Sequence, residues 1–156
     1  MKVRLIRQGA ERLGLSIVKA GVRDASAPKE ALEKADRVLC DVPCSGLGVI
    51  RRKPEIRYKS MKELDGLPDL QYLILCESAE LVREKGKLFY STCTLNPEEN
   101  GKIANRFLLE HPGFAPLALD LPEGIVRKID EPENQITIFP FTADSDGFFV
   151  AAFQKI

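Results

Sequence analysis

Apolar residues recur at helical spacing in three stretches of the chain. Residues 1–14 carry an apolar stripe that stops at Gly14, a common residue after a helix. Residues 70–85 carry a second stripe and are followed by Gly86 as a predicted cap. Residues 97–110 carry a third, with Asn96 suited to the N-cap and Pro97 to the first helical position. A shorter helix is predicted over residues 28–34.

Short apolar runs between these helices predict strands. They cover residues 15–19, 37–41 and 87–91, and later residues 114–119, 136–139 and 148–153, the last preceded by the turn SDG at 145–147. Helices alternate with strands first, and strands pair near the C-terminus. The pattern therefore predicts one α/β domain over residues 1–156, with a parallel sheet that ends in an antiparallel hairpin. Residues 42–69 form an irregular connection that is long enough to be functional.

Composition narrows the class of protein. The 156 residues are 44% hydrophobic and 29% charged, typical of a globular domain. The 23 basic residues equal the 23 acidic ones, which argues against a dedicated basic nucleic-acid module but allows a local patch. No run approaches the about 20 apolar residues of a membrane span, and the N-terminus does not read as a signal peptide. We expect a cytoplasmic protein with no membrane partner.

The four cysteines are expected to be thiols in that compartment. They are Cys40, Cys44, Cys76 and Cys93. Their spacing lacks the pairs that zinc requires, and His111 is the single histidine, so no metal site is predicted. The C-x-x-C of thioredoxin-like enzymes is absent. Arg51 comes seven positions after Cys44 rather than six, which excludes a phosphatase-type cysteine loop.

Two cysteine-centred motifs follow two of the predicted strands. The motif DVPCSGLG (residues 41–48) follows RVLC, and STCTLNPEEN (residues 91–100) follows KLFY. The carboxyl ends of neighbouring parallel strands meet at one crevice, where ligands bind. We therefore expect Asp41, Cys44 and Cys93 to share a site. Two thiols and a carboxylate suit covalent chemistry on a ring carbon.

Each of these residues also has a simpler explanation. Cys93 lies before the first turn of a helix, where backbone N–H groups and the helix dipole favour a thiolate, yet most cytosolic cysteines are small core residues. The core explanation is preferred for Cys40 and Cys76. Asp41 can hold a polar ring edge or cap a loop. Pro43 and the glycines constrain the loop around Cys44, but no Lys-Ser/Thr follows them, so a P-loop is rejected.

A basic cluster follows Cys44 directly. It combines five cations with one aromatic residue: Arg51, Arg52, Lys53, Arg57, Tyr58 and Lys59. Such a cluster can contact an RNA backbone and stack a base. A solvated loop face is the usual explanation of a charge run, but the position after Cys44 brings the RNA interpretation close to it.

Taken together, these segments closely resemble the RNA cytosine-C5 methyltransferases, in particular the Sun-type bacterial 16S rRNA enzymes. The resemblance rests on both cysteine motifs, on RRKP at 51–54, on DGFF at 146–149, and on the helix over residues 2–14 with Asp24. It implies a Rossmann-like class I fold that uses S-adenosylmethionine, and RNA as the partner, with rRNA favoured.

The resemblance also implies roles for single residues. Cys93 would add to cytosine C6, Asp41 would hold the N3/N4 edge, and Cys44 would assist removal of the C5 proton and release of the adduct. Asp24 would contact the cofactor adenine, with Asp41 and Pro43 also at the cofactor site. The base must leave its stack to reach the thiols.

The chain departs from the family pattern in its cofactor loop. The Gly-rich loop, the acidic residue for the ribose and an N-terminal RNA-binding domain are not found in it. We therefore expect the C-terminal part of a longer catalytic domain, inactive by itself. The strand at 37–41 is then left with an open edge, which we expect the strand at 15–19 or a second copy of the chain to cover. A non-catalytic RNA-binding or assembly module is the alternative; an α/β domain with structural thiols ranks last.

Overall fold

The computed structural model describes residues 2–27, 33–60 and 64–156. The helices are α1 (Lys2–Arg12), α3 (Leu67–Ala79), α4 (Gly101–Glu110) and α5 (Pro140–Ala143). The strands are β1 (Ala35–Asp41), β2 (Val82–Thr92), β3 (Phe114–Pro116), β4 (Gln135–Ile138) and β5 (Phe148–Lys155). Short 3₁₀ helices lie at η1 (Leu47–Val49), η2 (Pro54–Tyr58) and η3 (Pro97–Glu99).

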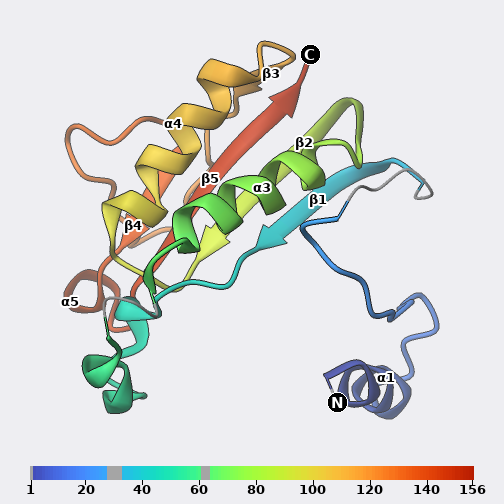
Figure 1. Cartoon of the computed structure of the whole chain (residues 1–156), viewed down its shortest axis with the longest axis horizontal. Coiled ribbons are helices and arrows are strands. Elements are labelled where there is room, and N and C mark those ends of the chain that lie inside the picture. The colour runs from blue at the N-terminus through green and yellow to red at the C-terminus, as the bar shows by residue number, and fades with distance from the viewer. Residues whose placement is uncertain (1, 28–32, 61–63) are drawn as a thin grey trace.

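One mixed sheet organises the chain. β1 pairs with β2 in parallel, and β2 pairs with β5 in antiparallel orientation. The other edge of β5 is shared by β3 and β4, which pair with its two ends. Figure 1 shows α3 and α4 side by side across one face of the sheet. This arrangement confirms the predicted α/β fold, with a parallel pair first and antiparallel strands last.

The core lies between that face of the sheet and the two helices. β2 alternates inward and outward residues, so that Leu88 and Tyr90 are fully buried. Leu75 of α3, Phe107 of α4 and Phe153 of β5 fill the same layer without measurable exposure. These rigid elements hold the ends of β1 and β2, where both cysteine motifs begin.

Several predicted boundaries are wrong. The helix predicted over residues 70–85 is α3, which ends at Ala79, because Val82 begins β2 and pairs with Ala35. Gly86 lies inside β2 and is not a cap. The helix predicted over residues 97–110 is interrupted at Asn100, where η3 gives way to α4, although Asn96 does cap it by accepting from Glu98 N. The helix predicted over residues 28–34 falls largely outside the described residues.

The strand predicted over residues 15–19 does not form. These residues are turn and extended chain that connects α1 to β1, and Figure 1 shows α1 well apart from the sheet. In the described part of the chain β1 pairs only with β2, so its outer edge is not covered by residues 15–19 as expected. Leu39 of β1 is 71% exposed. That a second copy of the chain covers the outer edge of β1 stays a prediction.

Among the described residues, none of the helices has the length and apolar character needed to cross a bilayer.

Candidate active site

The two cysteine motifs meet at the carboxyl ends of β1 and β2. Asp41 is paired with Ser91 in the sheet, so Cys44 and Cys93 leave neighbouring strands at the same level. Their Sγ atoms lie 3.3 Å apart, and both side chains are half-buried. All four cysteines are described, and none is in a disulfide. The structure thus brings together the two thiols that the sequence placed 49 positions apart.

Backbone contacts lock the two loops together. Gly48 N donates to Cys93 O at 3.0 Å, and Gly147 N donates to Gly48 O at 2.8 Å. A Cβ atom at Gly48 would lie 2.8 Å from Cys93 O and closer still to Gly147 O. Only glycine permits this approach, so Gly48 joins the two cysteine loops to the turn before β5.

Asp41 and Pro43 lie beside the cysteines on the exposed side of the first loop. The Asp41 carboxylate accepts a hydrogen bond from Ser91 Oγ at 3.0 Å and remains exposed, so it can accept further bonds from a ligand. Pro43 is exposed, and its carbonyl accepts from Gln71 Nε2 at 2.9 Å.

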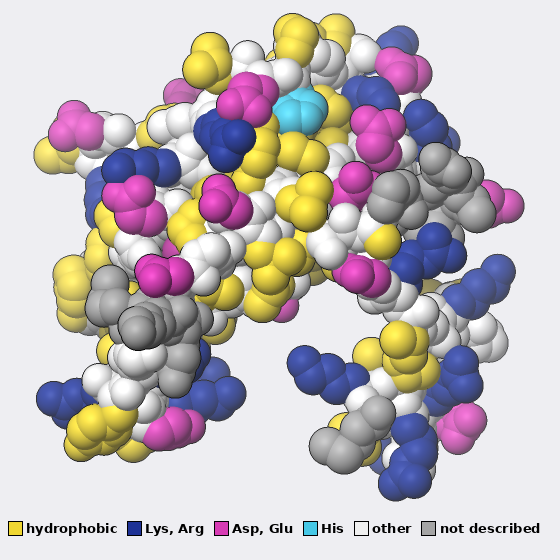
Figure 2. Space-filling view, viewed as in Figure 1, with side chains coloured by type: hydrophobic (Ala, Val, Ile, Leu, Met, Phe, Trp, Pro, Cys, Tyr) yellow, Lys and Arg dark blue, Asp and Glu magenta, His cyan; other side chains and the backbone are white. Residues whose placement is uncertain are grey.

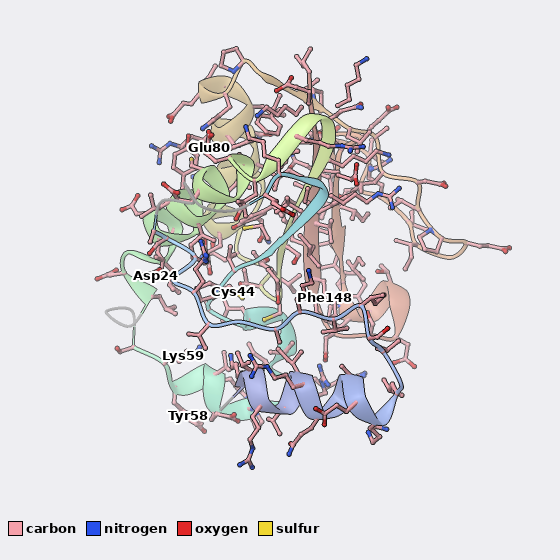
Figure 3. The ribbon with its side chains drawn as sticks, turned by 90° about the vertical axis from the view of Figure 1, so that its right-hand side faces the viewer. Asp24, Cys44, Tyr58, Lys59, Glu80 and Phe148 are labelled. Carbon is pink, nitrogen blue, oxygen red and sulfur yellow. The ribbon has the colours of Figure 1, made fainter. Side chains whose placement is uncertain are left out.

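Asp24 lies in the segment that joins α1 to β1. Its carboxylate accepts local bonds from the backbone and hydroxyl of Ser26. Figure 3 labels Asp24 and Cys44, and Figure 1 shows the segment of residues 20–27 beside the outer edge of β1.

The predicted RNA-binding cluster divides into two groups. Arg51 and Arg52 form ion pairs with Asp144 and Asp146, and Lys59 Nζ donates to Ser45 O at 2.9 Å. The second group has no such bond among the described residues and is exposed, with Tyr58 86% accessible: Lys53, Arg57 and Tyr58. Figure 2 shows Lys and Arg side chains around the projection at lower left that carries η2. The first group therefore holds the loop in place, and the second is available to a ligand.

The Cys44 thiol is protonated at neutral pH. Burial first, and then a hydrogen bond with Cys93, raise the pKa of Cys44 to about 12. A thiol in that state is a poor nucleophile.

Sequence reasoning missed a buried polar layer beneath the cysteines. It consists of five side chains that are at most 3% exposed: Ser45, Gln71, Thr94, Glu99 and Asn100. Ser45 Oγ and Thr94 Oγ1 lie 2.7 Å apart, and Asn100 Nδ2 donates to Thr94 O at 3.0 Å. Glu99 is one of two adjacent glutamates in the second cysteine motif. No sequence signal separates it from Glu98, which is exposed.

A cavity of about 300 Å³ lies on the other side of the second motif, lined by Leu95, Pro97, Lys128, Glu131 and Thr137 among others. Asp24, Asp41 and Pro43 are not part of its lining. No cluster of three or more metal-ligating side chains occurs among the described residues.

Comparison with known proteins identifies close relatives. The family model described as 16S rRNA methyltransferase RsmB/F matches residues 1–154. A protein of Bacillus subtilis (strain 168), named probable ribosomal RNA small subunit methyltransferase B, is 42% identical over 99% of this chain and 35% of its own length. A tRNA (cytosine(34)-C(5))-methyltransferase of Drosophila melanogaster is 41% identical over 54% of this chain and 11% of its own.

A solved structure shares the fold. The structure titled as NSun6 from Pyrococcus horikoshii with SFG superposes with a TM-score of 0.81, at 28% identity, over 97% of this chain and 38% of that one. The chain spans about a third of the length of the curated relatives that it matches over nearly its whole length.

Proposed function

Because this chain belongs to the 16S rRNA methyltransferase RsmB/F family, we propose that it carries the cysteine chemistry of an RNA cytosine-C5 methyltransferase. The observation that supports this most directly is the 3.3 Å separation of the Cys44 and Cys93 sulfur atoms at the ends of β1 and β2. Ribosomal RNA is the proposed substrate, since ribosomal RNA methyltransferases lead the relatives. Its site of action would be the cytoplasm.

Cys93 is the proposed nucleophile. Its sulfur forms a bond to C6 of an extruded cytosine, and the electron pair of the C5–C6 double bond makes C5 nucleophilic. Asp41, exposed beside it, holds the N3/N4 edge and stabilises the charge on the activated ring. The methyl group at C5 would come from bound S-adenosylmethionine, which would leave as S-adenosylhomocysteine. Loss of the C5 proton then re-forms the double bond, the C6–S bond breaks, and the electron pair returns to Cys93.

Cys44 is proposed to assist removal of the C5 proton and release of the covalent adduct. In the resting site its pKa is about 12, and the Cys93 sulfur contributes to that rise through a hydrogen bond and through charge repulsion. Both contributions from the sulfur end once it is bonded to carbon. The pKa of Cys44 therefore falls when the adduct forms, and a larger fraction of Cys44 is then thiolate, the form that can accept the C5 proton.

The described residues supply only one side of a cofactor site. Asp41 and Pro43 stand at the end of β1, Asp24 belongs to the segment that joins α1 to β1, and the chain contains no Gly-rich loop. We infer that the 156 residues alone do not methylate RNA. Titration calorimetry with S-adenosylmethionine should give no saturable binding to the folded chain, and micromolar binding would overturn this inference.

Cysteine variants test the reaction itself in the natural protein that contains this chain. Cys93→Ala should abolish methyl incorporation into RNA, because no bond to C6 forms. Cys44→Ala should instead trap protein–RNA adducts, seen as a shifted band on a denaturing gel. Cys76→Ala, half-buried on α3, is the matched control and should methylate normally. Full activity in the Cys93 variant would refute the assignment.

The remaining proposals concern partners. Lys53, Arg57 and Tyr58 are proposed to contact RNA, since they are exposed in the loop that follows Cys44. A second copy is proposed to cover the open edge of β1. Sedimentation of the chain over a range of concentrations should reveal a dimer, whereas a strictly monomeric species would contradict it.

A further inference from the structure

Glu99 is the most deeply enclosed carboxylate near the two cysteines. Its side chain belongs to η3 and is 1% exposed, and it forms no ion pair among the described residues. Burial alone would raise the pKa of Glu99, but hydrogen bonds from its neighbours outweigh burial and lower the pKa below its usual value. The carboxylate is therefore charged in the folded protein, held only by neutral donors.

These donors come from three separate segments. Oε2 accepts from Ser45 N at 2.8 Å and from Gln71 Nε2 at 2.9 Å, and Oε1 accepts from Asn96 Nδ2 at 3.0 Å. Ser45 follows Cys44 directly, Gln71 belongs to α3, and Asn96 lies in the loop that carries Cys93. A single carboxylate thus ties the Cys44 loop to the Cys93 loop.

Gln71 extends the tie to the other side of Cys44. The same Nε2 that donates to Glu99 also donates to Pro43 O at 2.9 Å. Both neighbours are acceptors, so the amide cannot turn around, and its Oε1 is left buried without a hydrogen-bond partner. The backbone on both sides of Cys44 is held by two side chains, the neutral Gln71 at Pro43 O and the charged Glu99 at Ser45 N.

This network leaves the Gln71 Oε1 acceptor buried without a hydrogen-bond partner, a feature that does not favour stability. Proteins usually tolerate a buried polar atom without a hydrogen-bond partner at functional sites. The side chains of Glu99 and Gln71 are not needed to fill the core, because apolar side chains such as Leu75 and Phe107 pack there without polar atoms.

We propose that Glu99 is a positioning residue that, through Ser45 and Gln71, holds the Cys44 thiol against Cys93. The inference rests on the proposed function for its role in release of the adduct, but the placement of the two sulfurs can be tested without any activity. Glu99 itself touches neither sulfur in the described contacts and acts through the loop backbone.

The test measures how close one thiol is to the other. The purified chain is equilibrated with mixtures of reduced and oxidised glutathione, in which the two thiols become a disulfide as one oxidised glutathione is reduced to two thiols. The equilibrium constant reports the effective concentration of one thiol at the other. Peptide mass spectrometry identifies the Cys44–Cys93 bond and excludes pairs with Cys40 or Cys76.

Glu99→Gln should lower this effective concentration by about tenfold, because a misplacement of about 1 Å is enough to cost one to two orders of magnitude in encounter of fixed groups. Glu98→Gln is the matched control. It removes the same charge one residue away, from an exposed carboxylate whose ion pair is with Lys102, and should leave the constant unchanged. A loss of overall stability alone would not change the constant of the folded protein.

An unchanged constant in a folded Glu99→Gln variant would overturn the inference. If that variant does not fold, Gln71→Met replaces the amide by an unbranched apolar side chain and should lower the constant by about threefold, because two of the bonds in the network are lost. A constant unaffected by Gln71→Met would then refute the proposal.

The activity of the natural protein distinguishes a failure of the positioning role from a failure of the proposed function. With Glu99→Gln, kcat should fall while KM for RNA stays near its value, and adducts should accumulate as with Cys44→Ala. Suppose that Glu99→Gln lowers the effective concentration but the wild-type natural protein does not methylate RNA. That result would support the positioning role and refute the proposed function. Normal turnover with a lowered effective concentration would refute the role of the positioning in release.

Discussion

The junction of the two cysteine loops and the segment of residues 2–27 are both rich in apolar residues, but they differ in what those residues contact. At the junction, α3 and α4 bury Leu75 and Phe107 completely against the sheet. In the N-terminal segment, Leu5 and Leu13 of the predicted stripe remain 57% and 62% exposed, and Figure 1 shows α1 standing apart from the sheet. The same sequence pattern yields a core in one region and an exposed face in the other. An apolar stripe forms a core only where another element packs on it.

Truncation of one leucine in each region tests this difference in packing most strongly. Leu75→Ala should lower the free energy of unfolding by about 2–5 kcal/mol, because it leaves a cavity in a fully buried layer. Leu5→Ala should change it by less than about 0.5 kcal/mol, since the side chain is already mostly in water. Urea unfolding of both variants measures the difference. Equal losses would mean that α1 packs on the body in solution.

Two glycines provide a backbone version of the same comparison. Gly48→Ala should lower the free energy of unfolding by about 3 kcal/mol, because the new Cβ would push against Gly147 O and Cys93 O. Gly9→Ala, in α1, meets no atom within 4 Å and should stabilise the helix by about 0.5–1 kcal/mol. Thermal unfolding followed by circular dichroism compares them. Tolerance of alanine at Gly48 would show that the two loops can separate.

The pH dependence of stability tests whether Glu99 is ionised at the junction of the two cysteine loops. Burial raises the pKa of Glu99, but the bonds from Ser45, Gln71 and Asn96 outweigh it and leave a lowered pKa. A lowered pKa in the folded state gives stability that is fully present above the pKa of an unfolded glutamate, about 4.3, and is lost as pH falls through the folded value.

The wild-type protein should therefore exceed Glu99→Gln in free energy of unfolding by about 2 kcal/mol at pH 7, from hydrogen bonds to a charged group. The difference should shrink as pH falls below about 4. Glu98→Gln, exposed and paired with Lys102, should show little difference at either pH. A gap between wild type and Glu99→Gln that widened in acid would contradict an ionised Glu99.

Removal of α1 should have the smallest effect. Among the described residues α1 forms no substantial packing interface with another helix or strand. Deletion of residues 1–20 should thus change the free energy of unfolding of the sheet by less than about 0.5 kcal/mol. Hydrogen exchange should show the same asymmetry, with α1 amides exchanging much faster than those of β2. Strong protection of α1 would indicate a contact that the single chain does not show.

Most of the site was predictable, because its residues stand in two compact motifs after apolar strands. Asp41, Cys44 and Cys93 were placed in one crevice from the rule that parallel strands end at a common edge. Asp24 was assigned to the cofactor site only through the family resemblance, and the strand predicted before it over residues 15–19 does not form. Boundaries failed where short apolar runs are ambiguous: Val82 fits a helical stripe and a strand equally, and pairing with Ala35 decided for the strand.

Local patterns and adjacent residues were enough to predict the fold class, the two cysteine motifs and the family resemblance. Only the tertiary structure decided that Cys44 and Cys93 lie 3.3 Å apart, that Arg52 pairs with Asp146, and that Glu99 rather than Glu98 is buried. The physical reason is that hydrogen bonds and ion pairs between distant segments depend on which side chains face each other. Neighbouring glutamates in one turn are chemically identical until one of them meets the backbone of another loop.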